Sequence, residues 1–288
     1  MGHATRRRRR ARKRAHEKRA ERLAAAQAQL TETGAGSPGL PFELATDDFE
    51  LSVTGEEAID DTPSPAPGDT AADGREPLDL PALDAAERMH QSAREALDAG
   101  DIVTAIAQYR DVLERMPDHV RARNNLALAL ERHGDVEGAL KELGRCIDLD
   151  PHNTALRVNR AAILGQAGQY NAAEQDLRMA VETDPGNSEA QFNLGLVLSR
   201  KGLWNNALPH LRRSLELDPH QAPAYFYLGE ALNHVDDLQG ALQAFQHAAE
   251  IQMDYRDAYY GMGIVLDRLN RPTEAAEMYR RSREPVQT

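Results

Sequence analysis

Cysteine is almost absent from this 288-residue sequence, and only 5% of its residues are aromatic. A single cysteine, Cys146, excludes a disulfide-stabilised scaffold and favours a reducing compartment, so we expect the protein in the cytoplasm. No stretch approaches the roughly 20 apolar residues that span a bilayer. The arginine run at 6–10 is not followed by the apolar segment of a secretory signal. We therefore expect neither a transmembrane segment nor a cleaved leader.

Motifs for catalysis and for cofactor binding are missing as well. The ten histidines include no pair four residues apart that would place two metal ligands on one helix face. No glycine-rich phosphate loop follows a strand, because no strand is predicted in the ordered part. Most carboxylates lie on amphipathic helix faces or in an acidic segment, where they are ordinarily solvated. We predict no enzymatic activity, no metal site and no cofactor.

Charge is distributed unevenly along the chain, whose formal net charge is −12. Residues 1–30 carry eleven Lys or Arg and two acidic side chains, which gives +9. Residues 31–85 carry fourteen acidic side chains against one arginine, which gives −13. These shifts predict a basic arm over residues 1–30, an acidic, disordered linker with Pro and Gly over 31–80, and a folded region over 81–288.

The basic arm suits an anionic partner. Its composition permits a helix, although repulsion among like charges opposes that helix in isolation. Nucleic acid is one candidate, because each phosphate contact releases counterions, but no aromatic residue interleaves the charges to stack on bases. A solvated tail, an anionic membrane surface and a nuclear-import signal stay open as alternatives. The residues expected to meet the partner are Arg6, Arg7, Arg8, Arg9, Arg10, Arg12, Lys13 and Arg14.

Two apolar clusters interrupt the acidic linker. Phe42 and Leu44 flank one glutamate, and Phe49 and Leu51 flank another seven residues later. Such clusters in an acidic, disordered segment are typical of docking peptides, although coincidence in a biased segment is the alternative. We also hypothesise that residues 40–53 fold back onto the folded region of the same chain, because the linker is long enough to do so.

The folded region repeats with a period of 34 residues. Alanine keeps this spacing without slippage at Ala105, Ala139, Ala173, Ala207, Ala241 and Ala275. Five residues before each alanine stands a residue that tolerates turn geometry: Gly100, Gly134, Gly168, Gly202, Asp236 and Asn270. Prolines at 117, 151, 185 and 219 mark where four of the units end. A fixed period of this length indicates a solenoid.

The repeat resembles the tetratricopeptide-repeat family, whose unit is a helix, a turn and a second helix. A small residue recurs in each first helix (Ala93, Ala127, Ala161, Gly195, Gly229 and Gly263), and a large one in each second helix (Tyr109, Leu143, Leu177, Leu211, Phe245 and Tyr279). The resemblance implies an all-α, right-handed helical solenoid of six helix-turn-helix units, preceded by a largely disordered N-terminal region. Polar residues replace large apolar ones at Arg123, Arg157, Arg160 and Gln191, which predicts looser packing in the middle units.

In this family the first helices line a concave surface that binds peptides. Asn125, Asn159 and Asn193 share one position in three consecutive units and resemble the amide ladder of the family's peptide-binding arrays. A solvated consensus asparagine is the alternative, and for the aromatic residues the alternative is packing against neighbouring helices. The residues expected to line the groove are Asn124, Asn125, Asn159, Asn193, Arg121, Arg132, Phe192, Phe226, Tyr227 and Tyr260.

We predict a non-catalytic adaptor, a monomeric array, that binds a peptide or protein on its concave surface. The alternative is a nucleic-acid or ribonucleoprotein-associated factor whose arm binds nucleic acid while the array recruits a partner. Capture of a chaperone's C-terminal carboxylate is disfavoured, because His90 and Arg94 stand where that clamp has Lys and Asn.

Overall fold

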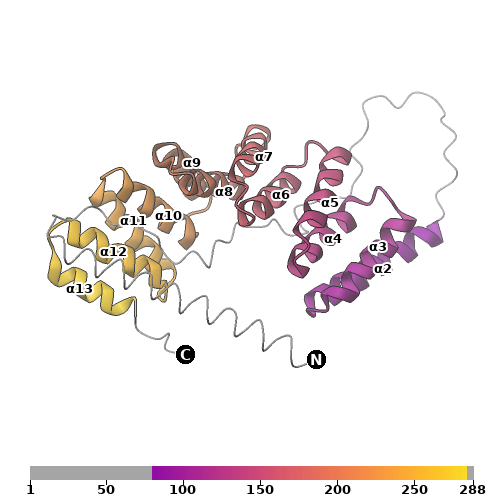
Figure 1. The fold of residues 1–288 in the computed structure, drawn as a ribbon, viewed down its shortest axis with the longest axis horizontal. Helices are drawn as coiled ribbons and strands as arrows, with labels where there is room; N and C mark the ends of the chain where they lie inside the picture. Colours follow the sequence, from indigo (N-terminus) through magenta and orange to yellow (C-terminus); the bar gives the residue numbers. More distant parts are fainter. Residues whose placement is uncertain (1–79, 284–288) are drawn as a thin grey trace, which may run out of the picture. The chain divides into compact units, whose positions relative to one another are not determined.

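The computed structural model describes residues 80–283, which form an all-α array (Figure 1). Within this range there are twelve helices and no strand. Their bounds are α2 (Leu80–Asp98), α3 (Ile102–Arg115), α4 (Val120–His133), α5 (Val136–Leu149), α6 (Thr154–Gln166), α7 (Tyr170–Thr183), α8 (Ser188–Arg200), α9 (Trp204–Leu217), α10 (Ala222–His234), α11 (Leu238–Ile251), α12 (Arg256–Arg268) and α13 (Pro272–Arg281). They form six consecutive pairs, as the 34-residue period predicts. None of these helices is long and apolar enough to cross a membrane.

The turn inside each pair has the geometry that its sequence predicts. All six residues of the turn column have a positive φ, from +58° at Asn270 to +92° at Gly134. Only glycine adopts this left-handed conformation without a steric cost, and Asn and Asp tolerate it better than other residues. The residue after the turn caps the second helix in three units, because the side chains of Asp101, Asp135 and Asp237 accept a backbone N–H three residues further on.

Each pair is held together by a small residue of the first helix facing a large residue of the second. A methyl group added at Gly195 would lie 2.7 Å from Cγ of Leu211, closer than carbon atoms can approach. The repeating alanines of the second helices are buried without exception, from Ala105 to Ala275. The small-to-large pattern therefore sets how closely the two helices approach.

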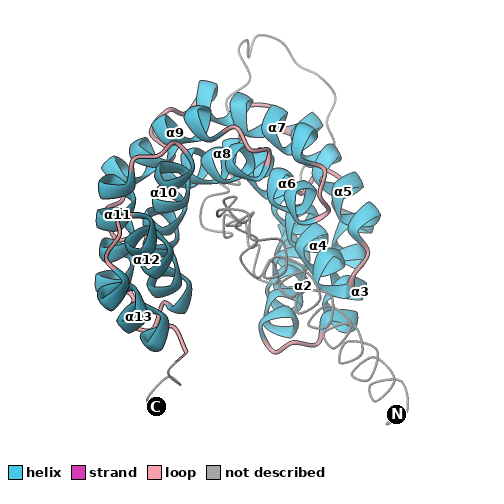
Figure 2. Cartoon of the chain, turned by 60° about the vertical axis from the view of Figure 1, so that its left-hand side comes forward, coloured by secondary structure: helices cyan, strands magenta, loops and turns pink. Residues whose placement is uncertain are grey.

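The pairs stack into an arc with two layers. Figure 2 shows the first helix of each unit, such as α6, α8 and α10, on the inner side of the arc, and the second helices, such as α7, α9 and α11, on the outer side. Each helix packs against its neighbours in sequence, and α6, α8, α10 and α12 also pack directly on one another. The inner layer is therefore a continuous surface from unit three to unit six.

The polar residues at the core positions of the middle units are hydrogen-bonded, whereas the looser packing expected of these units stays a prediction. Side-chain N–H groups of Arg123, Arg157 and Gln191 each donate to the carbonyl oxygen of the proline six residues earlier in the chain. The side chain of Arg123 also pairs with Glu142 on α5. Three consecutive units thus replace an apolar contact by a hydrogen bond that ties the inner helix to the loop before it.

Arg160 stands at a position where the repeat pattern predicts a core aliphatic residue. It forms an ion pair there instead of an apolar contact. Its Nε and Nη2 donate to the two carboxylate oxygens of Asp176 on α7, both at 2.6 Å. Arg157 lies 3.7 Å from the same carboxylate. Hydrogen bonding to Asp176 raises the pKa of Arg160 above its ordinary value. Unit three is therefore held by a bidentate pair, which is the strongest geometry for arginine and a carboxylate.

Candidate functional site

The asparagines predicted to form the ladder lie on the inner layer, but their side chains are buried. Asn124, Asn125, Asn159 and Asn193 are all between 0 and 4% exposed. Asn159 Nδ2 donates to Asn124 Oδ1 at 2.9 Å, which links α6 to α4, and Asn124 Nδ2 donates to Asn125 Oδ1 at 3.3 Å. Asn125 Nδ2 lies 3.4 Å from Nε2 of His90 on α2, so two of the amides take part in contacts between inner helices. Peptide binding by these residues stays a prediction.

The amide contact between α6 and α4 should contribute to stability. We expect Asn159→Ala to lower the free energy of unfolding by about 1–2 kcal/mol, because the buried oxygen of Asn124 loses its donor. Chemical denaturation of the full chain measures this change. Asn171→Ala is the matched control, since this amide is exposed on α7 and its removal should change stability by no more than about 0.5 kcal/mol. Equal effects would show that the contact between Asn159 and Asn124 is not maintained.

Most of the aromatic residues predicted for the groove belong to the packed layer. Phe192, Phe226 and Tyr227 are buried, and the ring of Phe226 lies 5.6 Å from Phe245 and 5.4 Å from Tyr255. Packing between helices, the alternative reading, therefore describes Phe226. Tyr260 on α12 differs, because 41% of it is exposed.

The two predicted basic residues of unit two differ in burial. Arg121 at the start of α4 is half-buried, whereas Arg132 near its end is exposed. Neither is brought next to the aromatic residues of units four to six by any contact that the structure records among the described residues. A single groove that includes both these arginines and the aromatic residues stays a prediction.

Sequence analysis missed a polar cluster on the inner layer of units four to six. We call Arg200, Tyr227, Glu230 and Asp257 the Glu230 cluster; they come from α8, α10 and α12. Arg200 Nη2 donates to the hydroxyl of Tyr227 at 3.1 Å, and its guanidinium lies 5.7 Å from the centre of the Tyr227 ring. The cluster joins three consecutive inner helices.

Glu230 is the unusual member of this cluster. It is 8% exposed, and within the described residues its carboxyl group has no hydrogen bond or ion pair. Burial is the main cause that raises the pKa of Glu230 to about 8; Arg200 opposes this rise and Asp257 adds to it. The repeat contained a signal for this site. The equivalent residues of the other five units are Arg94, Leu128, Ala162, Leu196 and Ile264, so Glu230 is the only acid in its column.

Three potential metal ligands meet between units one and two. Ligand atoms of Glu87, His90 and His119 lie within 4.8 Å of one another. However, Nδ1 of His119 accepts the backbone N–H of Ala122 and so caps α4. A neutral histidine that accepts at Nδ1 carries its proton on Nε2, which points toward Glu87 at 3.6 Å. This geometry fits a helix cap paired with a carboxylate, and a metal at Nε2 would require the cap to be given up.

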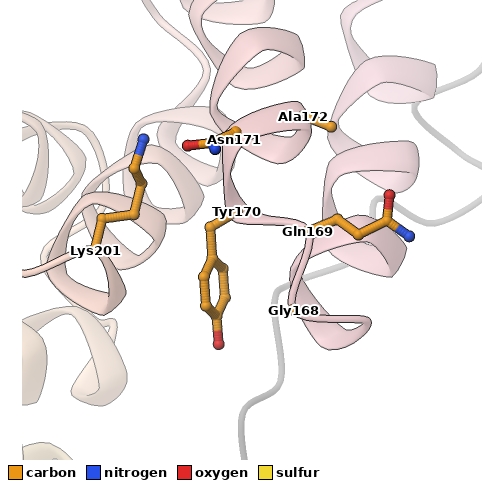
Figure 3. Close-up of a pocket in the computed structure, with 6 residues that line it drawn as sticks. All are labelled: Gly168, Gln169, Tyr170, Asn171, Ala172 and Lys201. Atoms are coloured by element: carbon orange, nitrogen blue, oxygen red, sulfur yellow. The ribbon is translucent and has the colours of Figure 1, made fainter.

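A surface hollow and the single cysteine do not form binding or catalytic sites in this structure. A surface hollow of about 340 Å³ lies at the turn between α6 and α7, but Figure 3 shows its side chains, including Tyr170, Gln169 and Lys201, diverging rather than converging. Lys201 is moreover paired with Glu174. Cys146 is fully buried, and burial raises the pKa of its thiol to about 12, so it is not a thiolate nucleophile at neutral pH.

The predicted sites of the N-terminal region lie outside the described residues. These are the cationic side chains of the arm between Arg6 and Arg14, and the apolar clusters at Phe42, Leu44, Phe49 and Leu51. The expected binding of nucleic acid or of an anionic surface by residues 1–30 therefore stays a prediction.

Solved structures with a similar arrangement of helices include proteins described as tetratricopeptide repeat proteins. The structure of pilF from Pseudomonas aeruginosa has a TM-score of 0.62 at 20% identity, covering 69% of this chain and 90% of that one. A tetratricopeptide repeat protein from Parabacteroides merdae has a TM-score of 0.61 at 17% identity, covering 70% and 81%. YrrB, described as a TPR protein with an unusual peptide-binding site, has a TM-score of 0.53 at 23% identity, covering 60% and 90%. These likenesses show the fold.

Sequence comparison identifies the family. A curated relative, tetratricopeptide repeat protein 36 of Xenopus tropicalis, is 35% identical over 80 residues, which are 26% of this chain. The match spans 39% of that relative's length. Family models described as tetratricopeptide repeat match residues 90–154, 132–196 and 196–255, which together extend from the first unit to the end of the fifth. The chain therefore belongs to the tetratricopeptide-repeat family.

Proposed function

We propose that this protein is a non-catalytic adaptor that binds a peptide or protein segment on the inner layer of units four to six. The observation that carries the proposal is Tyr260, which is 41% exposed and lies on an inner helix one turn beyond Asp257 of the Glu230 cluster. Its ring lies 5.6 Å from that of Tyr279 on α13. A large aromatic side chain is costly to leave in water and is typical of the anchor residues at peptide interfaces. The polar cluster beside it supplies hydrogen-bonding groups that fix orientation.

Two further points support this proposal. Members of the family use the inner surface for protein partners, and one of the structurally similar proteins is described as having a peptide-binding site. The only cysteine, Cys146 on the outer helix α5, is buried and protonated, so it is not available as a thiolate nucleophile. Nucleic-acid binding by the arm, a monomeric state and a cytoplasmic location stay predictions.

The test is a peptide-display selection on the immobilised full chain, followed by affinity measurements on the selected peptides. We expect Tyr260→Ala to weaken binding by about tenfold or more, since a buried aromatic anchor contributes about 2 kcal/mol. Leu149→Ala is the matched control, because Leu149 is 43% exposed but lies on the outer helix α5. Selected peptides that bind both variants as tightly as the wild type would place the binding surface elsewhere and contradict the proposal.

A further inference from the structure

We propose that units four and five carry a second binding surface, a cleft that takes an apolar side chain of a partner protein with a carboxylate beside it in the partner's sequence. The cleft lies where the outer helix α9 of unit four packs against the inner helix α10 of unit five. We call it the junction cleft; the residues that line it are Arg212, Leu215, Glu216, Tyr225 and Leu228.

The junction cleft is separate from the inner surface proposed above to bind a peptide. Successive residues of an α-helix are about 100° apart, so Tyr225 and Leu228 lie about 200° around α10 from Tyr227 and Glu230. They therefore face α9 and not the Glu230 cluster. The cleft is an additional surface, and it goes beyond the proposed function.

A polar side chain fills the equivalent place in each of the three preceding units. These side chains donate to the carbonyl oxygen of the proline six residues earlier, and each also contacts a polar residue of the outer helix that follows. The three pairs are Arg123 with Glu142, Arg157 with Asp176, and Gln191 with His210. In unit five the pair is Tyr225 and Ala244. Alanine offers no side-chain acceptor, and within the described residues Tyr225 makes no hydrogen bond, so the cleft is left open here.

The floor of the junction cleft is apolar. Leu215 is 8% exposed, and Tyr225 and Leu228 are half-buried. The ring of Tyr225 lies 5.2 Å from that of His247, so it also packs against the outer helix α11 of its own unit. The volume of the cleft is about 300 Å³, at the lower limit of the range of about 300–1,000 Å³ for ligand pockets. We therefore expect it to hold one side chain rather than a cofactor.

The rim of the cleft supplies one cation that has no ion pair in the described part of the chain, Arg212. Its equivalent in unit three, Arg178, pairs at 2.6 Å with a glutamate one turn earlier on the same helix. Leu208 stands at that place before Arg212, so the same pair cannot form. The other charged residue of the rim, Glu216, is paired with Arg213 at 2.9 Å. Charge complementarity therefore favours a carboxylate beside the apolar side chain of the ligand.

The apolar contact should contribute most of the affinity, and the ion pair most of the selectivity. An exposed ion pair contributes little to binding, because water and salt screen it, whereas large side chains seated in pockets dominate the energetics of most interfaces. A protein segment is the expected occupant, because residues on either side of the inserted one can contact the exposed surfaces of α9 and α11. These contacts add the area that a single side chain lacks.

The experiment is a peptide-display selection on the full chain, with subtraction on a variant in which the cleft is filled. In this variant Tyr225→Gln and Ala244→His install the polar pair of unit four. Peptides that bind the inner surface bind both proteins, so the subtraction removes them. We expect the remaining peptides to carry an aromatic or large aliphatic residue beside Asp or Glu. They should bind the filled variant at least about tenfold more weakly than the wild type.

A second variant tests the rim and leaves the apolar floor unchanged. Arg212 is exposed, so we expect Arg212→Glu to melt as the wild type does and to bind the selected peptides about three- to tenfold more weakly. A peptide whose acidic residue is replaced by lysine should regain that loss on Arg212→Glu. Lys141→Glu is the matched control, because it reverses an exposed charge on the outer helix α5 and should change binding by less than about twofold.

The outcomes separate the cleft from the inner surface. If the subtraction leaves no peptides, or if Arg212→Glu has no larger effect than Lys141→Glu, the junction cleft is not the site we propose. If the filled variant melts well below the wild type, the subtraction is repeated on Arg212→Glu, and the same two results decide. Tyr260→Ala should leave the selected peptides unaffected. Peptides that Tyr260→Ala weakens and the filled variant does not would support the proposed adaptor function alone.

Discussion

Replacing Gly229 by alanine is expected to lower the free energy of unfolding by about 2–3 kcal/mol, although the same change in an open helix usually stabilises a protein. A Cβ atom at this position would lie 2.7 Å from two carbon atoms of the Phe245 ring. The ring cannot retreat, because it is fully buried and a Cβ atom at Gly261, on the next inner helix, would lie 2.7 Å from its far edge. The ring is therefore fixed between two glycine backbones.

The control for this prediction is another helical glycine of the same chain. A Cβ atom at Gly144 on α5 would meet only the guanidinium end of Arg160, at 4.0 Å. We therefore expect Gly144→Ala to raise the free energy of unfolding by about 0.5–1 kcal/mol. Denaturant titration of the two variants and the wild type measures both changes. Stabilisation by both substitutions would show that α10 and α11 are farther apart than the structure has them.

The regular part of the fold could be predicted from sequence because each unit repeats the same local requirements. Turn residues, helix-ending prolines and small-to-large pairs act within one unit, so six copies of each reinforce a single interpretation. The positive φ values at Asp236 and Asn270 illustrate this, since both residues were placed in turns only by their spacing from glycines. Local geometry that recurs in every unit can be predicted from the sequence without knowledge of how the units stack.

The candidate site could not be predicted in the same way, because it depends on contacts between units. Asn159 appears at the same position as Asn125, which suggested an exposed ladder, but its amide bonds to Asn124, one residue earlier in the previous unit. Whether an inner residue faces a ligand or the next helix depends on the rotation between units, which a 34-residue period does not specify. The Glu230 cluster was missed for the same reason, although Glu230 interrupts an otherwise acid-free column.

The second large effect on stability is expected from the ion pair between Arg160 and Asp176 in unit three. We expect Asp176→Ala to lower the free energy of unfolding by about 3 kcal/mol, because two arginines on α6 would lose their carboxylate. Asp176 is 3% exposed, so water does not readily replace it next to Arg160 and Arg157. Glu182→Ala, which removes an exposed acid from the same helix, should cost no more than about 0.5 kcal/mol.

A second variant separates two quantities: the net contribution of the ion pair to the free energy of unfolding, and the destabilisation caused by removing only one of its partners. In Arg160→Leu combined with Asp176→Leu, the core aliphatic residue typical of the family returns and both charges leave together. We expect this double variant to lie within about 1 kcal/mol of the wild type, because buried ion pairs are often replaceable by apolar residues of similar volume. Arg157 keeps its hydrogen bond to the carbonyl of Pro151 in this variant. If the double variant were as unstable as Asp176→Ala, the pair would be a net stabilising contact that leucine cannot replace. The departure from the family pattern would then be an advantage for this unit rather than a neutral substitution.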